Sequence, residues 1–363
     1  MSLAIVALAT GRPPNSIAQA EAAELAKTFA SGNGATARLV PALFRRSKVE
    51  RRSSVVLEPL GVSPGRQTFY PAASTEADRG PTTRERMLRY AEEAGPLAVD
   101  VSRRALQQSG VAPQQISHLI TVTCTGFAAP GVDVALIRGL GLSSSIARTN
   151  IGFMGCHGAI NGLRVAQGFA EADAKAVVLL CAVELCSLHF QYGRDPEKIV
   201  ANALFGDGAG ALIARSASSQ DSDAWRVTAT GSYLLPDAEG SMSWGIGDHG
   251  FEMTLSPRVP ELIHGHLRPW LVSWLAGQEL RLEDIRSWAI HPGGPRIVSA
   301  VAEALALAPA DTAASEQILA ECGNMSSPTI LFILERFQKQ NCPRPCLALG
   351  FGPGLTAEVA LLR

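Results

Sequence analysis

Hydrophobic residues in the first half of the chain follow two patterns, one typical of buried strands and one of amphipathic helices. Residues 116–124 and 176–184 are short apolar runs without alternation, as in strands covered on both faces. Residues 156–172 place apolar side chains three and four positions apart, which predicts a helix. A longer helix is predicted to begin at Thr82 or Thr83, with Glu85 near its first turn.

The second half repeats this scheme after a polar break. The break is SASSQDSD, residues 216–223, and it divides the chain into a half at residues 1–220 and a half at residues 221–363. A glycine-rich turn leading into an apolar strand is expected late in each half, as GDGAGALIA and GFGPGLTAEVALL, which suggests duplication. Buried strands mixed with helices predict an α/β sandwich of layers. The elements expected in the second half lie at residues 225–235, 259–275, 286–290, from 295, 327–337, 347–354 and 357–363.

Composition agrees with a folded protein that has no strongly charged partner. Of 363 residues, 47% are hydrophobic and 18% are charged, so a large core can form. Lys and Arg number 32 and Asp and Glu 33, for a net charge of -1. This balance provides neither a basic field for nucleic acid nor a polybasic membrane anchor.

Targeting and cysteine signals point to the cytoplasm. No apolar run approaches the ~20 residues of a transmembrane helix, and the apolar N-terminus lacks the positive region of a signal peptide. Seven cysteines, an odd number spread through a long chain, are typical of reduced thiols. Cys342 and Cys346 are spaced C-x3-C without a second ligand pair nearby, so no metal site is expected.

One cysteine stands in a setting that favours nucleophilic chemistry. Cys156 lies in GFMGCHG, between glycines and at the start of the helix predicted over 156–172. The positive end of a helix dipole is expected to lower the pKa of a thiol placed there, and the glycines permit close approach of a substrate. The alternative is a buried structural cysteine, which describes Cys181 in the middle of a predicted strand better.

Two residues are candidates to assist Cys156. His291 ends an apolar strand and precedes a rigid Pro-Gly-Gly-Pro loop, a position where α/β proteins place site residues. Asn324 lies in the loop before a helix whose N-terminus is marked by Ser327 and Pro328. Taken alone, His291 could equally be a core histidine and Asn324 a turn residue.

A family resemblance joins these positions. The motifs GFMGCHGAINGLRVA, ALFGDGAGALIA, HPGGPRIV, CGNMSSPTILFIL and GFGPGLTAEVALL occur in this order over residues 152–362. Together with TTRERM, TVTCTGFAAPGVD and VELCS, they resemble the type III polyketide synthases, the chalcone synthase-like branch of the thiolase superfamily. The resemblance implies a thiolase-like αβαβα five-layered sandwich of two duplicated halves, a homodimer, and a Cys-His-Asn triad matching Cys156, His291 and Asn324.

The same resemblance implies the substrates and their contacts. Malonyl-CoA and an acyl-CoA starter are expected, with no cofactor and no carrier protein, because the family loads free CoA thioesters. The family's gatekeeper phenylalanine matches Phe205 in LFGDG, and a basic residue for the CoA phosphates matches Arg46 in the Arg-rich segment 45–52.

Departures from the plant chalcone synthases indicate a different starter. The chain has cysteine or histidine at positions where those enzymes have threonines, and a bulky residue where they have glycine. It has alanine at the position of the family's methionine that reaches across the dimer. Several segments instead resemble bacterial synthases that make alkylpyrones, alkylresorcinols or phloroglucinols, so a fatty acyl-CoA starter and an apolar tunnel are expected. The substrate-binding candidates at these positions are Cys124, Cys186 and His189 for the threonines, Trp244 for the glycine and Ala129 for the methionine, with Glu184 of VELCS beside them.

The expected chemistry agrees with the residue types. A cysteine thiolate accepts an acyl group from CoA, and malonyl-CoA must lose carbon dioxide to leave an enolate. His291 Nε2–H and the Asn324 amide are donors that could stabilise the enolate oxygen, whereas a carboxylate at residue 324 would repel it. The resemblance then implies repeated extension and cyclisation to an alkylpyrone, alkylresorcinol or related phenolic.

Three other functions remain open from the sequence alone. A ketoacyl synthase III uses the same triad but performs one condensation with an acyl carrier protein. A nucleotide-binding oxidoreductase is suggested by the glycines of GDGAGA, although a dinucleotide-binding loop must follow a strand and open a helix. A non-catalytic dimeric scaffold is the third, and a turnover assay distinguishes it from an enzyme.

Overall fold

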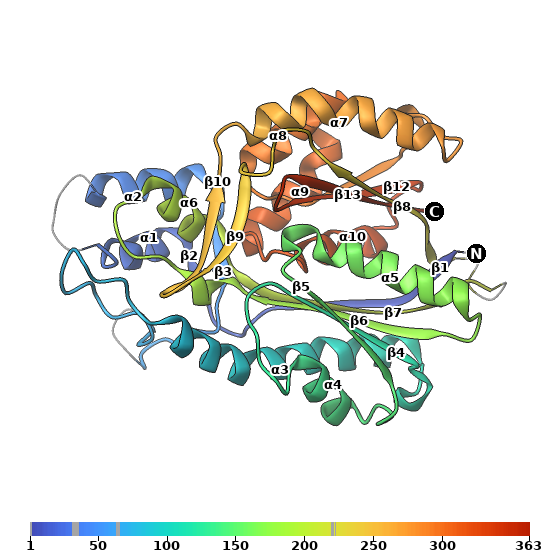
Figure 1. Cartoon of the computed structure of the whole chain (residues 1–363), viewed down its shortest axis with the longest axis horizontal. Coiled ribbons are helices and arrows are strands. Elements are labelled where there is room, and N and C mark those ends of the chain that lie inside the picture. Colours follow the sequence, from blue (N-terminus) through green and yellow to red (C-terminus); the bar gives the residue numbers. More distant parts are fainter. Residues whose placement is uncertain (1, 31–35, 63–65, 219–220, 222) are drawn as a thin grey trace.

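Five layers of helices and strands are stacked in the chain (Figure 1). The computed structural model describes residues 2–30, 36–62, 66–218, 221 and 223–363. Nine strands are hydrogen-bonded in the order β11-β12-β13-β8-β1-β7-β6-β4-β5, and short β1–β8 pairing joins the strands of the two halves. This arrangement confirms the α/β thiolase-like class. The boundary predicted at residue 220 falls outside the described residues.

The strands of the first half form one β layer, covered on its outer side by α3 and α4. α3 begins after Thr82, whose Oγ1 accepts the Glu85 N–H at 3.3 Å, and it stops before Gly110 in the left-handed region. The strand runs predicted over 116–124 and 176–184 correspond to β4 and β6. The bounds are β1 Leu3–Gly11, β4 His118–Thr123, β5 Ala147–Gly152, β6 Val177–Leu185, β7 Asp207–Ser216, α3 Thr83–Ser109 and α4 Val132–Leu140.

The strands of the second half form the other β layer, which α7 and α8 cover. β8, β13 and β12 are antiparallel neighbours, while β11 pairs with β12 in parallel. The helix that the sequence predicted from Pro295 is α8. The bounds are β8 Trp225–Leu234, β11 Ser287–Ile290, β12 Cys346–Gly352, β13 Thr356–Leu362, α7 Val259–Ala276 and α8 Pro295–Leu305.

The central layer holds α5, Gly158–Ala172, and α10, Thr329–Lys339 (Figure 1). Their apolar faces bury Ile160, Leu163, Ile330 and Leu331 against strands of both β layers. α9, Pro309–Cys322, packs beside α10 and was not predicted from the sequence. Because the first turns of both helices are buried, the loops that precede them are held firmly.

Smaller elements gather at one end of the layers, on the left of Figure 1. The sequence indicated a glycine-rich turn at GDGAGA, but Gly208 and Gly210 lie inside β7, where Leu331 packs against Gly210. This correction also removes the nucleotide-binding alternative, since these glycines do not open a helix. The elements are α1 Gln19–Lys27, α2 Thr36–Arg46, α6 Pro196–Leu204, the pair β2 Ser16–Ala18 and β3 Arg51–Ser53, and the hairpin β9 Met242–Gly247 with β10 Gly250–Leu255.

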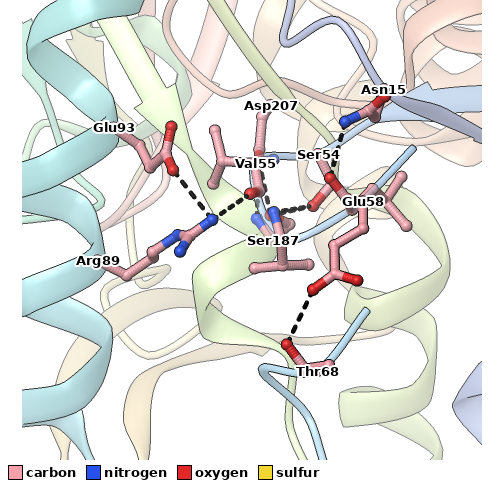
Figure 2. Close-up of polar contacts among 11 residues, drawn as sticks. Asn15, Ser54, Val55, Glu58, Thr68, Arg89, Glu93, Ser187 and Asp207 are labelled. Atoms are coloured by element: carbon pink, nitrogen blue, oxygen red, sulfur yellow. Dashed lines mark hydrogen bonds and ion pairs between the residues drawn. The ribbon is translucent and has the colours of Figure 1, made fainter. Parts of the chain in front are cut away.

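A buried polar network fixes the segment after β3 to the loop near Phe205 (Figure 2). Asp207 accepts the Val55 N–H at 2.8 Å and both the N–H and the Oγ–H of Ser187, at 2.7 and 2.6 Å. Ser54 Oγ donates to Ser187 Oγ at 2.6 Å, and Arg89 holds the Val55 carbonyl at 3.1 Å. Burial raises the pKa of Asp207 to about 6. The network therefore anchors β7 beside the candidate site.

Candidate active site

Cys156 lies in a single 3-10 turn, Gly155–His157, directly before α5. Gly155 has φ 75°, and a Cβ there would lie 2.4 Å from Pro353 Cδ, so the turn requires glycine. Its N–H also donates to Cys124 Sγ at 3.1 Å. The placement before a helix agrees with the sequence expectation.

The backbone of Asn324 is clamped beside Phe205. Its N–H donates to the Leu204 carbonyl at 2.8 Å, and its own carbonyl accepts the Gly206 N–H at 3.0 Å. Gly323, with φ 72°, makes the preceding turn, and a Cβ at that position would lie 2.7 Å from the Leu204 oxygen. This bridge brings the loop after α9 to the end of α6.

The side chain of Asn324 faces the candidate nucleophile. Its Oδ1 accepts the Ser326 N–H at 2.8 Å, which identifies the opposite amide atom as nitrogen. Nδ2 lies 3.9 Å from Cys156 Sγ and donates to the Gly293 carbonyl at 3.4 Å. Oδ1 lies at the same 3.9 Å from Cys156 Sγ, so the amide group faces the sulfur with both its oxygen and its nitrogen.

His291 follows β11 and is held by its N–H, which donates to the Leu349 carbonyl at 2.8 Å. Its side chain is buried, and among the described residues neither ring nitrogen has a hydrogen-bond partner. Buried polar atoms nearly always have one, so an unpartnered imidazole is available to a ligand. The hydrogen bond from Asn324 to Gly293, two residues beyond His291, joins the two loops.

Burial disfavours an isolated charge on either group. It raises the pKa of the Cys156 thiol to about 11, while hydrogen bonds with Ser326 and Asn324 act in the opposite direction. Burial, with a smaller contribution from His157, lowers the pKa of His291 to about 3. This corrects the expectation of a lowered thiol pKa, since burial outweighs the helix terminus. Transfer of a proton from sulfur to imidazole would form two opposite charges together, which is less costly than either alone.

An apolar cavity adjoins Cys156. Its walls include Cys124, Cys186, Phe205 and Trp244, all of which the sequence placed at the substrate site. The Trp244 indole N–H donates to the Cys124 carbonyl at 2.8 Å and holds the ring across the cavity. The volume is about 40 Å³, close to the ~30 Å³ that one water molecule occupies. The described residues therefore leave a small pocket beside Cys156 rather than the expected apolar tunnel.

Glu184 lies behind this pocket, fully buried at the end of β6. Its carboxylate accepts the Cys124 N–H at 2.8 Å and the Thr125 hydroxyl at 2.8 Å, and Ser327 donates to its other oxygen at 2.7 Å. Burial raises the pKa of Glu184. Because these partners are all donors, the carboxylate ties the end of β4 to the Asn324 loop.

Neither His189 nor Ala129 lines the pocket at Cys156 in this chain. His189 uses both ring nitrogens on the backbone, at 2.7 Å from the Thr125 carbonyl and 2.9 Å from the Phe251 N–H. Its ring stacks on Phe251 and meets Trp244 edge-on, so it supports the pocket wall from behind. Ala129 is exposed on the surface.

The arginines of segment 45–52 do not form one surface. Arg52 is buried, and its guanidinium bonds the carbonyl groups of Asn202 and Phe205, which removes it from any CoA contact. Arg45 and Arg51 line two separate grooves. Arg46 is exposed at the end of α2.

Several residues that line the pocket were not predicted from the sequence, including two methionines and a serine. Met242 and Met253 come from the β9–β10 hairpin, and Ser326 from the Asn324 loop. A period-two pattern around the turn Gly247-Asp248-His249-Gly250 could have indicated the hairpin. Ser326 has φ 57°, an unusual conformation for serine that no sequence signal indicated.

The described residues form neither a candidate metal centre nor a membrane-spanning helix. Within the described ranges, no group of three or more His, Cys, Asp or Glu residues could hold a metal ion. Among the helices in those ranges, none is both long and apolar enough to cross a membrane.

Comparisons with known proteins agree on one family. Residues 2–218 match the N-terminal domain of chalcone and stilbene synthases, and residues 226–363 match their C-terminal domain. The chain is 34% identical to the "Alpha-pyrone synthesis polyketide synthase-like Pks18" of Mycobacterium tuberculosis, over 98% of this chain and 89% of the relative. It is 32% identical to a 1,3,6,8-tetrahydroxynaphthalene synthase of Streptomyces peucetius, over 99% and 92%.

A solved structure gives the same result. The crystal structure of PKS-I from the brown alga Ectocarpus siliculosus superposes with a TM-score of 0.93 at 31% identity. The superposition covers 100% of this chain and 98% of that one.

Proposed function

The chain belongs to the chalcone and stilbene synthase family, the type III polyketide synthases, and we propose that Cys156, His291 and Asn324 form its catalytic triad. Family membership makes it an acyltransferase that forms carbon–carbon bonds by Claisen-type condensation, and it favours this activity over that of a ketoacyl synthase III. The observation that carries the proposal is the contact of the Asn324 amide with Cys156 Sγ at 3.9 Å; the same amide donates to the Gly293 carbonyl, two residues after His291, whose buried ring has no partner among the described residues.

In the proposed loading step, Cys156 Sγ attacks the carbonyl carbon of an acyl-CoA. The bond between sulfur and the acyl carbon forms, and the bond to the CoA sulfur breaks. His291 takes the thiol proton and returns it to the departing CoA thiolate. This route avoids a free thiolate in the pocket, which the raised pKa of Cys156 opposes.

In the proposed extension step, malonyl-CoA loses carbon dioxide to form an enolate. The Asn324 Nδ2–H and one N–H of neutral His291 donate to the enolate oxygen. The lowered pKa of His291 keeps its ring neutral at pH 7, with one donor available. The enolate carbon then attacks the acyl-Cys156 carbonyl, and sulfur leaves. Phe205, at the pocket wall, excludes water from the thioester.

A fatty acyl-CoA is the proposed starter, and an alkylpyrone, alkylresorcinol or related phenolic the product. The relative named for alpha-pyrone synthesis supports this choice. The pocket walls Cys124, Cys186 and Met253 are apolar enough for an alkyl chain. Because a volume of about 40 Å³ is too small for an alkyl chain, we expect Trp244 to move when the chain enters.

Replacing Trp244 with alanine should widen this pocket. We expect kcat/KM for long-chain acyl-CoA to rise about fivefold relative to short-chain acyl-CoA, since deletion of the indole opens the wall and frees the Cys124 carbonyl. Product formation from a series of starters measures this ratio. Trp270→Ala is the matched control, because Trp270 stacks on Tyr233 in the outer layer. An equal change for all starters would contradict a gating role for Trp244.

Arg46 is proposed to contact the CoA phosphates. Arg46→Glu should raise the KM for malonyl-CoA about tenfold and change kcat less than about twofold, because a phosphate contact far from the reacting atoms contributes uniform binding. Initial rates over a range of malonyl-CoA concentrations test this. Arg51→Glu, on another groove of the same segment, should leave KM unchanged. An unchanged KM in Arg46→Glu would assign Arg46 to the general surface.

A homodimer, a cytoplasmic location and a reaction without a cofactor or carrier protein complete the proposal. β5 is the outermost strand of its layer, so one edge is open to pairing. Phe153 follows β5, and its ring stacks on Phe127, which is 49% exposed. This apolar surface beside an open strand edge supports self-association there.

One assay tests the proposed activity as a whole. Purified protein is given malonyl-CoA and acyl-CoA starters of different lengths, with no carrier protein or added cofactor, and the products are identified by mass spectrometry. Several extensions on a fatty starter are expected. A single extension, or a requirement for carrier protein, would contradict the proposal.

A further inference from the structure

A second polar site lies where β1 ends, between α3, α9 and α10, and is called the basic groove here. Its volume is about 720 Å³, within the ~300–1,000 Å³ of small-ligand sites. It shares no lining residue with the pocket at Cys156. Its lining contains two carboxylates, Glu321 and Glu335, and five cations, Arg12, Arg51, Arg104, Arg336 and Lys339.

Three of the five cations have carboxylate partners. Two of these partners are the carboxylates of the groove itself, and the third is on α3. Such pairs leave little charge for a ligand. They join Arg336 to Glu321 at 2.6 Å, Lys339 to Glu335 at 3.0 Å, and Arg104 to Asp100 at 2.9 Å.

Arg12 and Arg51 differ from the other three. Within the described part of the chain, neither forms an ion pair with a carboxylate, and both side chains are exposed. Arg12 Nη1 donates to the Glu321 carbonyl at 2.9 Å and lies 3.4 Å from Cys322 Sγ. Arg51 Nη1 donates to Ser16 Oγ at 3.0 Å. Each guanidinium is therefore held through one nitrogen, and its remaining N–H donors are available.

We propose that the basic groove binds a small ligand carrying a diphosphate group, through Arg12 and Arg51. The planar guanidinium pairs bidentately with phosphate oxygens, and two of them match two linked phosphates. The hydrogen bonds at Nη1 orient both side chains before binding, which lowers the entropy cost. The volume exceeds the size of a diphosphate alone and leaves room for an organic group such as a nucleoside.

The basic groove is independent of the proposed acyl-transfer chemistry. Arg46, which we assign to the CoA phosphates, does not line it, whereas Arg51, from the same arginine-rich segment, does. Its floor includes Cys322, two residues before Asn324, so it lies behind the loop that carries the amide. Binding there can therefore be measured on the enzyme without substrates.

Calorimetric titration of the full chain with inorganic pyrophosphate and, separately, with ADP tests the proposal. We expect binding that weakens with added salt, with about tenfold lower affinity in each of Arg12→Ala and Arg51→Ala and a further loss in the double variant. Arg281→Ala, at an exposed position that does not line the basic groove, is the matched control and should bind as the unchanged protein does.

The two probes separate the possible sources of the diphosphate. Tighter binding of ADP than of pyrophosphate indicates a nucleotide-like ligand, and equal affinities indicate recognition of the diphosphate alone. Either result supports the site if the double variant no longer binds the probes. Arg12→Lys keeps the positive charge but loses the planar guanidinium that pairs with two oxygens, so its affinity should lie between those of the unchanged protein and Arg12→Ala. This variant tests the site even if Arg12→Ala folds poorly. No binding of either probe, or equal binding by the double variant, overturns the proposal.

Discussion

Cys156→Ala is expected to lower polyketide formation by at least about 10⁴-fold, because no other group can form the acyl-enzyme. The neighbouring thiols Cys124 and Cys186 line the same pocket, but burial raises both of their pKa values well above the ordinary range. Neither thiol has the place before a helix that Cys156 has. Product quantification with a fatty acyl-CoA and malonyl-CoA measures the loss.

Intact-protein mass spectrometry after incubation with starter alone identifies the acylated residue. The unchanged protein should gain one acyl group, and Cys156→Ala should gain none. Cys181→Ala, a buried position in β6, is the control and should still be acylated. Acylation of Cys156→Ala at another cysteine would contradict the assignment of Cys156 as nucleophile.

Each member of the proposed triad could be singled out in the sequence because it stands at an element boundary with local signals. Cys156 precedes a helix with a clear apolar period, His291 follows a buried strand, and Asn324 precedes α10. Ser327 was predicted to cap α10, but Pro328 is the residue before the helix and the Ser327 hydroxyl donates to Glu184 instead. The meeting of the three triad members depends on long-range packing, since the loops of Cys156 and Asn324 belong to the two central helices, α5 and α10. The family resemblance predicted that these loops come together, whereas the hydrophobic periodicity alone did not.

Other features depend on side-chain directions that a linear pattern does not encode. Arg51 and Arg52 are adjacent and chemically equal, yet β3 alternates its faces, so one is exposed and the other buried. His189 was predicted at the substrate site from its position in the sequence, but both of its ring nitrogens bond the backbone and it does not line the pocket. The thiol pKa was misjudged because the sequence shows the helix terminus and not the burial.

Asn324→Asp is expected to lower decarboxylation of malonyl-CoA by about 10³-fold, and Asn324→Ala by about 10²-fold. In Asn324→Asp one carboxylate oxygen still accepts the Ser326 N–H, which keeps the side chain in place. The other oxygen replaces Nδ2, so a negative charge faces both the Gly293 carbonyl and the developing enolate. Alanine removes the donor without adding repulsion. Release of carbon dioxide from malonyl-CoA, measured without a starter, compares the two variants.

If Asn324 acts on the enolate, the same two variants should slow the extension step much more than the loading step. The starter acyl group has no developing enolate, so acylation of Cys156 in both variants should stay within about tenfold of the unchanged protein. Asn341→Asp, at an exposed position after α10, makes the same chemical change on the surface and should decarboxylate normally. Parallel loss of loading and decarboxylation would instead assign Asn324 to holding the loop beside Phe205. Asp and Asn have nearly the same shape. A lower decarboxylation rate in Asn324→Asp than in Asn324→Ala would therefore identify charge, and not packing, as the cause.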